Sequence, residues 1–213
     1  TEASAVSSTI SYDSNAKQLI ETLPVPKYGT VKFSFSNSDN EEDWFTVSDA
    51  DDASLKQTNG GSYTIYYKVA ETDNYAGLSG NVSKTIDAAE NAISAVTIAD
   101  WTYNTTASTP TVTSTWGDAT ATYQYKLSTA DDGTYTEYNP NEAGKYPTDV
   151  NTYTLKATIA ATDNYETASS TQNFDITKAD AGLVADNIQI NDAAVADTYK
   201  YSDALALTAS YNG

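Results

Sequence analysis

Residues 62–75 read SYTIYYKVAETDNY, and residues 152–165 read TYTLKATIAATDNY. Tyr63 recurs as Tyr153, and the Thr-Asp-Asn-Tyr sequence that begins at Thr72 recurs at Thr162, so matched residues lie 90 positions apart. A fixed period predicts that one structural unit has been duplicated. The chain of 213 residues has room for two such units, each large enough to bury its own core.

Weaker matches extend the period upstream of these two blocks. Tyr12-Asp13 is echoed by Tyr103-Asn104, and Tyr28-Gly29 is echoed by Trp116-Gly117. The offsets of these pairs drift from 90 by one or two residues. We expect the drift to lie in loops, which tolerate insertions and deletions.

Apolar residues alternate with polar ones in both blocks, which is the pattern of a strand with one buried face. The residues expected to face the core are Tyr63, Ile65, Tyr67 and Val69 in the first block and Tyr153, Leu155, Ala157 and Ile159 in the second. The Asp and Asn that follow favour a turn, because their side chains bond to nearby backbone amides. We expect a second strand after each turn, ending near Ile86 and Ile176.

Residues that favour strands dominate the chain, and no long stretch repeats apolar residues at helical spacing. The predicted class is therefore all-β. Gly-Ser-Tyr63 and Asn-Thr-Tyr153 open the penultimate strand of each unit much as a tyrosine corner does. We expect tandem immunoglobulin-like β-sandwich domains in an elongated arrangement.

The YKVAETDNY and TIAATDNY blocks, each closing into a strand at Ile86-Asp87-Ala88 or Ile176-Thr177-Lys178-Ala179, resemble the bacterial immunoglobulin-like repeats of giant surface proteins. The resemblance covers most of residues 9–180. The end of the chain, with Thr198-Tyr199-Lys200-Tyr201 and Leu207-Thr208-Ala209, is similar to the opening half of the related MBG/YDG-type repeats. Such repeats build stalks and adhesin shafts.

The expected domains are one repeat at residues 1–91, a second at 92–180 and the start of a truncated third at 181–213. The third copy is too short for a complete sandwich. Its apolar residues must therefore be buried on the second domain or on a neighbouring molecule if it is ordered. These residues are Leu183, Ile188, Ile190, Leu205 and Leu207.

The composition excludes several classes of partner. Cys, Met, His and Arg are absent, and 11 lysines face 29 carboxylates, which gives a net charge of -18. Nucleic-acid binding needs Lys and Arg to neutralise phosphates, so we expect no DNA or RNA partner. Anionic lipids are disfavoured for the same reason, and no apolar run approaches the ~20 residues of a membrane span, so we expect no membrane insertion.

The zero cysteine count argues against an animal secreted domain and fits the exterior of a bacterial cell. Thr1-Glu2-Ala3-Ser4 has neither the basic start nor the apolar stretch of a signal peptide. We therefore expect a fragment of a longer extracellular protein on the bacterial surface.

Catalytic chemistry has few residues available. Nucleophilic triads and most proton-transfer pairs need His or Cys, and paired carboxylates for glycoside cleavage are not brought together by any feature of the sequence. The acidic residues cluster instead in loops at 39–43, 49–52 and 131–132. We expect no enzyme, no catalytic residue and no cofactor.

Asp49, Asp51 and Asp52 are the candidates for a structural calcium site, because Ca²⁺ takes several oxygen ligands. The loop lacks the glycine and the distal glutamate of an EF-hand, and Asp-rich turns are usually solvated. The favoured prediction is no metal site, and calcium at this loop stays open.

Lys84 is predicted to point inward beside Val82 and Ile86, where the second copy has Phe174. The resemblance to bacterial adhesins allows an isopeptide bond from Lys84 to an Asn or Asp. The favoured interpretation is an inward lysine on an edge strand, which blocks strand-to-strand aggregation, with a side chain that reaches past the rim.

The 17 tyrosines suit strands by propensity, and exposed ones could also stack on sugars or on a host protein. The expected outward or loop positions are Tyr66, Tyr123, Tyr125, Tyr135 and Tyr138. No ligand-binding residue can be named from this pattern.

The leading functional expectation is a structural stalk or shaft whose partners are the neighbouring repeats of the same chain. Short joints at residues 88–94 and 178–182 would set its stiffness. The alternative is a module that binds host glycan or protein directly. A third interpretation is a surface-layer or matrix component.

Overall fold

The computed structural model describes residues 2–180 and the short strands at 188–190, 193–194 and 207–209. The regular structure of this part is β-strand, apart from short 3-10 helices. The all-β class predicted from the composition is therefore confirmed. The 3-10 helices are η1 (Glu41–Asp43), η2 (Ala53–Leu55), η3 (Asp118–Thr120) and η4 (Asp132–Thr134).

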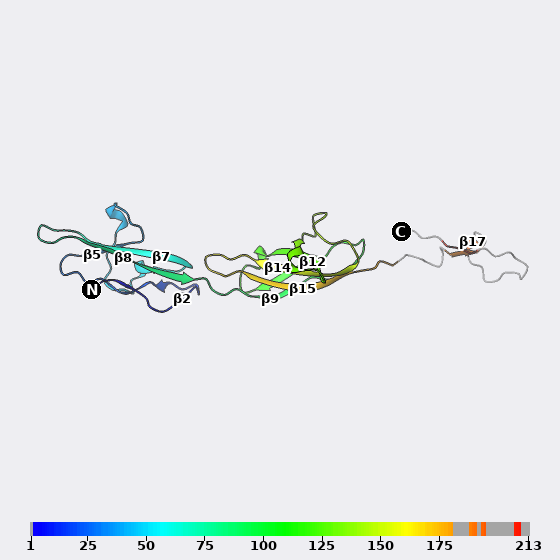
Figure 1. Ribbon diagram of the computed structural model, residues 1–213, viewed down its shortest axis with the longest axis horizontal. Helices are drawn as coiled ribbons and strands as arrows, with labels where there is room; N and C mark the ends of the chain where they lie inside the picture. Colours follow the sequence, from blue (N-terminus) through cyan, green and yellow to red (C-terminus); the bar gives the residue numbers. More distant parts are fainter. Residues whose placement is uncertain (1, 181–187, 191–192, 195–206, 210–213) are drawn as a thin grey trace, which may run out of the picture. The chain divides into compact units, whose positions relative to one another are not determined.

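The N-terminal sheet has four strands in the order β2-β8-β7-β5 (Figure 1). Its strands are β2 (Ile10–Ser11), β5 (Val31–Ser34), β7 (Gly61–Val69) and β8 (Leu78–Asp87). The β7–β8 hairpin and the β5–β7 pair are antiparallel, whereas β2 runs parallel to β8. The first strand of this sheet therefore lies beside its last strand.

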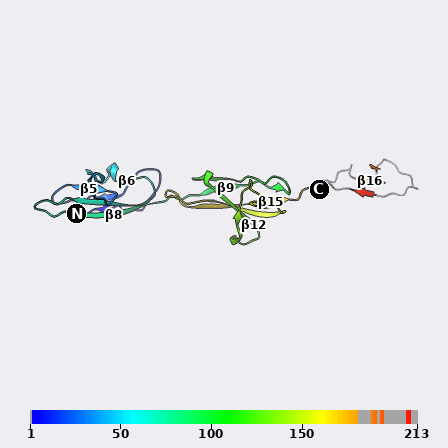
Figure 2. The same ribbon diagram turned by 90° about the horizontal axis from the view of Figure 1, so that it is seen from above.

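Short strand pairs accompany this sheet in the N-terminal part (Figures 1 and 2). They are β1 (Ser4–Ala5) with β4 (Ile20–Thr22) and β3 (Lys17–Gln18) with β6 (Lys56–Gln57). Both pairs are antiparallel. Ile20 at the start of β4 and Leu19 directly before it are buried in the core on the sheet.

The N-terminal core is one cluster that draws on the sheet and on the short strands. Its buried members are Leu19, Ile20, Phe33, Leu55, Ile65, Tyr67 and Ile86. Ile65 and Tyr67 alternate with the more exposed Thr64 and Tyr66, which confirms the predicted inner face of β7. Burial of each large apolar side chain stabilises the fold by about 1.5–3 kcal/mol.

A second sheet has the strand order β10-β15-β14-β12-β13. Its strands are β10 (Trp101–Thr102), β12 (Thr122–Leu127), β13 (Thr136–Glu137), β14 (Asn151–Ile159) and β15 (Ala168–Thr177). As in the N-terminal sheet, the short strand β10 runs parallel to the last strand β15. A separate pair joins β9 (Ile93–Thr97) to β11 (Thr111–Ser114).

Aromatic side chains fill the core of the second sheet. The ring of Phe174 stacks on Trp101 and Tyr153, with centroids 5.0 and 5.5 Å away, and meets Tyr138 edge-on at 6.3 Å. Tyr125 makes edge contacts with Tyr138 and Tyr153. Tyr138 lies in a loop directly after β13, as one of the two predicted placements had it, but it is only 4% exposed, so the predicted outward position is wrong.

The two long hairpins match residue for residue. The bounds of β7 and β8 recur 90 positions later as the bounds of β14 and β15. Each hairpin begins with the same hydrogen bond, since the Tyr63 hydroxyl donates to the Asn59 carbonyl and the Tyr153 hydroxyl donates to the Asp149 carbonyl, both over 2.9 Å. A bond of this kind is the mark of a tyrosine corner.

The chain divides into two compact units. The first comprises Thr1–Val96, Thr111–Thr122 and Lys156–Thr171, and the second comprises Thr97–Pro110, Tyr123–Leu155 and Gln172–Gly213. The turn between β14 and β15 therefore belongs to the same unit as the whole N-terminal sheet.

Strand β16 (Ile188–Ile190) pairs antiparallel with β17 (Ala193–Ala194) and with β18 (Leu207–Ala209). Leu183 and Leu205 lie outside the described residues, and of Ile188, Ile190 and Leu207 only the backbone is described, so the expectation that these five residues bury their side chains on another body stays a prediction.

Candidate functional site

The most elaborate contact of the first unit is made by the turn at residues 162–165, which we call the docking turn. It joins β14 to β15 and packs against Asn59 and Gly60, directly before β7. We call these two residues the Asn-Gly edge. Every residue of this contact belongs to the first compact unit.

Local hydrogen bonds fix the shape of the docking turn. The backbone amide of Thr162 donates to the carbonyl of Tyr165 over 2.9 Å. The Thr162 hydroxyl accepts from the amides of Asn164 and Tyr165 over 3.3 and 3.1 Å. The turn predicted from Thr-Asp-Asn-Tyr is confirmed, and it presents Asn164 and Tyr165 in a defined orientation.

Asn164 carries the polar part of the contact. Its side-chain oxygen accepts from the Gly60 amide over 2.7 Å, and its side-chain nitrogen donates to the Asn59 side chain over 3.3 Å. Its carbonyl accepts from the Ala89 amide over 2.9 Å, and the Ala89 carbonyl accepts from the Glu166 amide over 2.9 Å. The turn is thus bound both to the Asn-Gly edge and to the segment that follows β8.

The Asn-Gly edge accepts the turn only because position 60 has no side chain. A Cβ atom at Gly60 would lie 1.8 Å from the carbonyl oxygen of Asp163, which is far inside van der Waals contact. The bond from Tyr63 to the Asn59 carbonyl holds the edge in place from its other side. The tyrosine corner therefore also orders a docking surface.

Tyr165 provides the apolar part of the contact. Its ring stacks on Trp116 with centroids 5.1 Å apart and meets the edge of Tyr12 at 5.3 Å. Asn91, which is only 6% exposed, holds the backbone of Trp116 by accepting from its amide and donating to its carbonyl. Aromatic pairs of this geometry contribute about 0.5–1.5 kcal/mol each beyond burial.

The acidic loop predicted as a calcium candidate uses its carboxylates in other ways. Asp49 accepts from the Asp51 amide over 2.9 Å, and Asp52 caps η2 by accepting from the Ser54 amide over 2.8 Å. Asp51 pairs with Lys56 over 2.8 Å. Within the described residues, no group of three or more acidic side chains gathers as a metal site would require.

Lys84 lies on β8 opposite Tyr63, with less exposure than its neighbours Ser83 and Thr85, which confirms its predicted parity. Its ammonium donates to the carbonyl of Ser8 over 2.6 Å. No carboxylate of the described part lies within ion-pair distance of it, so the contacts do not favour an isopeptide bond to an Asp, and a bond to an Asn stays a prediction.

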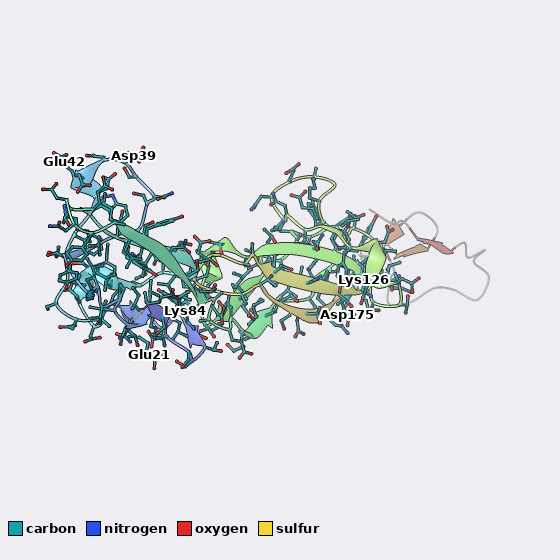
Figure 3. All side chains as sticks on the ribbon, turned by 60° about the vertical axis from the view of Figure 1, so that its left-hand side comes forward. Glu21, Asp39, Glu42, Lys84, Lys126 and Asp175 are labelled. Atoms are coloured by element: carbon teal, nitrogen blue, oxygen red, sulfur yellow. The ribbon has the colours of Figure 1, made fainter. Side chains whose placement is uncertain are left out.

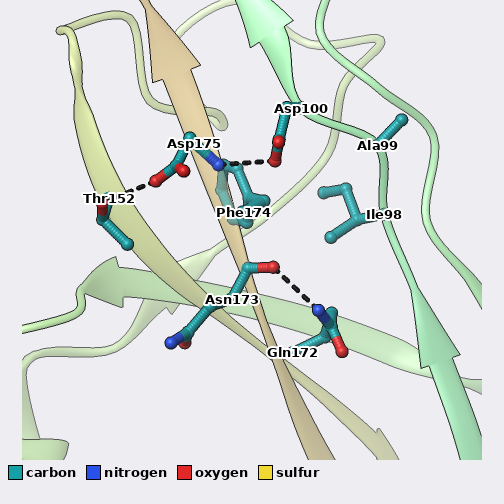
Figure 4. Close-up of a pocket in the computed structure, with 8 residues that line it drawn as sticks. All are labelled: Ile98, Ala99, Asp100, Thr152, Gln172, Asn173, Phe174 and Asp175. Atoms are coloured by element: carbon teal, nitrogen blue, oxygen red, sulfur yellow. Dashed lines mark hydrogen bonds between the residues drawn. The ribbon is translucent and has the colours of Figure 1, made fainter.

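An open depression in the second unit is lined by polar residues around Phe174 (Figure 4). The Thr152 hydroxyl donates to Asp175, and the Asp175 amide donates to Asp100 over 2.8 Å. Phe174 is the aromatic residue of the lining, and it is only 2% exposed. The depression therefore offers no ring on which a sugar could stack, and its carboxylates are held by their neighbours.

Carboxylates also cover the surface around η1, where Figure 3 shows Asp39 and Glu42. Glu41 of this helix binds the ammonium groups of Lys32 and Lys68. These two hydrogen-bonded partners lower the pKa of Glu41 to about 2. Lys68 also lies 4.1 Å above the ring centre of Trp44.

The joint predicted at residues 88–94 supplies one segment of the docking site, but the sequence does not predict the contact. Ala89 and Asn91 lie within the joint predicted at residues 88–94, and the turn itself was expected. Of the second predicted joint, at 178–182, only residues 178–180 are described. The signal for the docking was the Asn-Gly pair, which in sequence alone indicates any turn.

Comparison of the chain with protein-family models, with curated proteins and with solved structures gave no match. Among the described residues, no helix has the length and apolar character needed to cross a bilayer.

Proposed function

We propose that the chain is a structural repeat region, a stalk or shaft, of an extracellular bacterial surface protein or adhesin that projects a distal binding region. In this proposal, residues 1–91 and 92–180 are tandem immunoglobulin-like sandwiches. The matched hairpins and the two tyrosine-corner hydrogen bonds support that assignment. The acidic surface keeps such a chain soluble.

The observation that carries the proposal is the docked turn. A linker between modules bends freely unless contacts restrain it. Here the segment after β8 is bonded to Asn164 and Glu166 through Ala89, and the Asn-Gly edge is bonded to the same turn. A joint restrained in this way suits a shaft, which must hold its end away from a surface.

The strand pairing supports the same role. In each sheet a short early strand runs parallel to the last strand, with the Tyr12 amide bonded to the Asp87 carbonyl over 2.9 Å and the Tyr103 amide bonded to the Thr177 carbonyl over 2.8 Å. Tension along the chain pulls such strands in opposite directions along their axes. Their hydrogen bonds are then sheared together rather than broken one at a time.

Single-molecule pulling on the full chain tests the mechanical role. We expect abrupt unfolding events, and we expect Tyr103→Pro to lower the force of one of them because it removes the amide bonded to Thr177. Tyr103→Ala is the matched control, since it removes the ring but keeps the amide. Gradual extension without force peaks would contradict the proposal.

The alternative role, direct binding of host glycan or protein, is tested by probing arrays of both ligand classes with the full chain. A shaft gives no specific signal. A reproducible signal that free ligand competes away would favour the adhesive module instead.

A further inference from the structure

The first hairpin carries a turn of the same Thr-Asp-Asn-Tyr sequence as the docking turn, and the two turns share one backbone hydrogen bond. We call residues 72–75, between β7 and β8, the counterpart turn. Its Thr72 amide donates to the Tyr75 carbonyl over 2.9 Å, as Thr162 does to Tyr165. The ring of Tyr75 stacks on Tyr28 with centroids 3.8 Å apart, as Tyr165 stacks on Trp116.

The residues around the stacked pairs Tyr28–Tyr75 and Trp116–Tyr165 also match. Tyr28 precedes Gly29 and Trp116 precedes Gly117, and the two glycines have φ values of +85° and +86°. A Cβ at Gly29 would meet Val69, and a Cβ at Gly117 would meet Ile159, which lies 90 positions after Val69. A hydrogen bond between the hydroxyls of Tyr28 and Tyr75 raises the pKa of Tyr75 and joins the two rings further.

The two turns differ in what covers them. Tyr165 and Asn164 are half-buried against Tyr12 and the Asn-Gly edge. All four residues of the counterpart turn are exposed, and Tyr28 and Tyr75 expose 46% and 45% of their surface. Leu78, at the same end of the hairpin, exposes 47%, whereas its counterpart Ala168 is buried.

We propose that the counterpart turn, with Tyr28 and Tyr75, is a docking surface for a second copy of residues 1–91, presented through the Asn-Gly edge of that copy. This proposal rests on the proposed function, because it extends the joint inside the chain to a further module. Asn74 would bind Gly60 and Ala89 of the copy, and Tyr75 would pack on its Tyr12. The occupant is inferred from the equivalent contact that the docking turn makes within this chain.

The missing side chain at Gly60 is the reason why the proposed partner is a copy of residues 1–91. The position 90 residues after Gly60 is Val150, which carries a Cβ and two further carbons. Because even a Cβ at Gly60 would overlap the docking turn, an edge of the Asp149-Val150 kind cannot receive the turn in the same way. The counterpart turn can therefore dock on the Asn59-Gly60 edge before the first hairpin, but not on the Asp149-Val150 edge before the second.

Distance measurements between paired spin labels test the proposal, because the chain has no cysteine of its own. The full chain is extended at its N-terminus by a second copy of residues 1–91. One label is placed at Ser83→Cys of the added copy and the other at Asn81→Cys of the original chain. The reference is the unextended chain labelled at Ser83→Cys and Thr171→Cys, since Thr171 lies 90 positions after Asn81.

We expect the extended chain to give a distance distribution as narrow as that of the reference. Gly60→Val in the added copy, or Tyr28→Ser with Tyr75→Ser in the original chain, should broaden it. The tyrosine variants should leave the reference pair unchanged, and circular dichroism checks that each variant stays folded. A distribution that is broad in the extended chain but narrow in the reference would overturn this proposal alone, whereas a broad reference would overturn the proposed function.

Discussion

A methyl group added at position 60 would be forced against the carbonyl of Asp163, so Gly60→Ala must move the docking turn or the edge. We expect the Ala89 amide, which donates to Asn164, to exchange with solvent at least roughly tenfold faster, equivalent to about 1.4 kcal/mol of lost protection. Hydrogen exchange measured by NMR reports this amide directly.

Gly133→Ala is the control for that change, because nothing lies within 4 Å of a Cβ built at Gly133. This variant should leave exchange at Ala89 as it is in the natural sequence. An unchanged rate in Gly60→Ala itself would show that the edge is not restrained by the turn.

Glu41 gives a pH-dependent prediction. Its pKa is lowered from 4.5 to about 2 by hydrogen bonds to Lys32 and Lys68. A lowered pKa in the folded state adds stability above the unfolded value, and that stability is lost as the pH falls through the folded value. The contribution is small because the carboxylate is exposed to solvent.

We expect Glu41→Gln to unfold at a slightly lower temperature than the natural chain at pH 7. The difference between the two should shrink between about pH 4.5 and pH 2 and vanish below it. Thermal melts of both proteins across this range measure the difference, and common effects of the other carboxylates cancel. A difference that stays constant with pH would show that the ion pairs do not stabilise the fold.

At the scale of the elements, the two hairpins depend on their tyrosine corners. Removing the hydroxyl in Tyr63→Phe or Tyr153→Phe leaves a backbone carbonyl without its donor, and we expect each change to cost about 1 kcal/mol in the free energy of unfolding. Burial raises the pKa of Tyr153, and the nearby Asp149 carboxylate adds to this, so its hydroxyl stays protonated and able to donate.

Urea denaturation measures these costs. Tyr66→Phe is the matched control on β7, because the Tyr66 hydroxyl makes no hydrogen bond within the described residues. If Tyr63→Phe, Tyr153→Phe and Tyr66→Phe all lower the free energy of unfolding by the same amount, the hydrogen bonds of Tyr63 and Tyr153 have no special role in these hairpins.

Much of each hairpin could be predicted from the sequence, because local rules govern it. Alternation in β7 and β14 follows from one buried face, and the turns follow from the chemistry of Asp and Asn. The burial of Tyr138 could not be predicted, since its core neighbour Phe174 lies far away in the sequence and an amphipathic tyrosine also suits a surface.

The docking contact also escaped prediction for a physical reason. The bond from Gly60 to Asn164 joins residues 104 positions apart, and no local pattern encodes such a contact. Asn and Gly in sequence indicate a turn with equal strength whether or not a partner covers it. Only the arrangement of the strands brings this pair to the docking turn.

For the whole molecule, the net charge of -18 makes the response to divalent cations informative. Asp49 and Asp52 accept backbone amides and Asp51 pairs with Lys56, so we expect no tight calcium site in this loop. The melting temperature should be the same in Ca²⁺, in an equal concentration of Mg²⁺ and in chelator at matched ionic strength. A rise that only Ca²⁺ produces would reveal a structural site.

The central claim is that the docking turn is held against the Asn-Gly edge within the first compact unit, as a restrained joint requires. Spin labels at Ser83→Cys and Thr171→Cys test it in the full chain, because both residues are exposed and belong to the first compact unit. The account predicts a single narrow distance distribution that broadens when Gly60→Val displaces the turn. Distributions of equal breadth with and without Gly60→Val would contradict it.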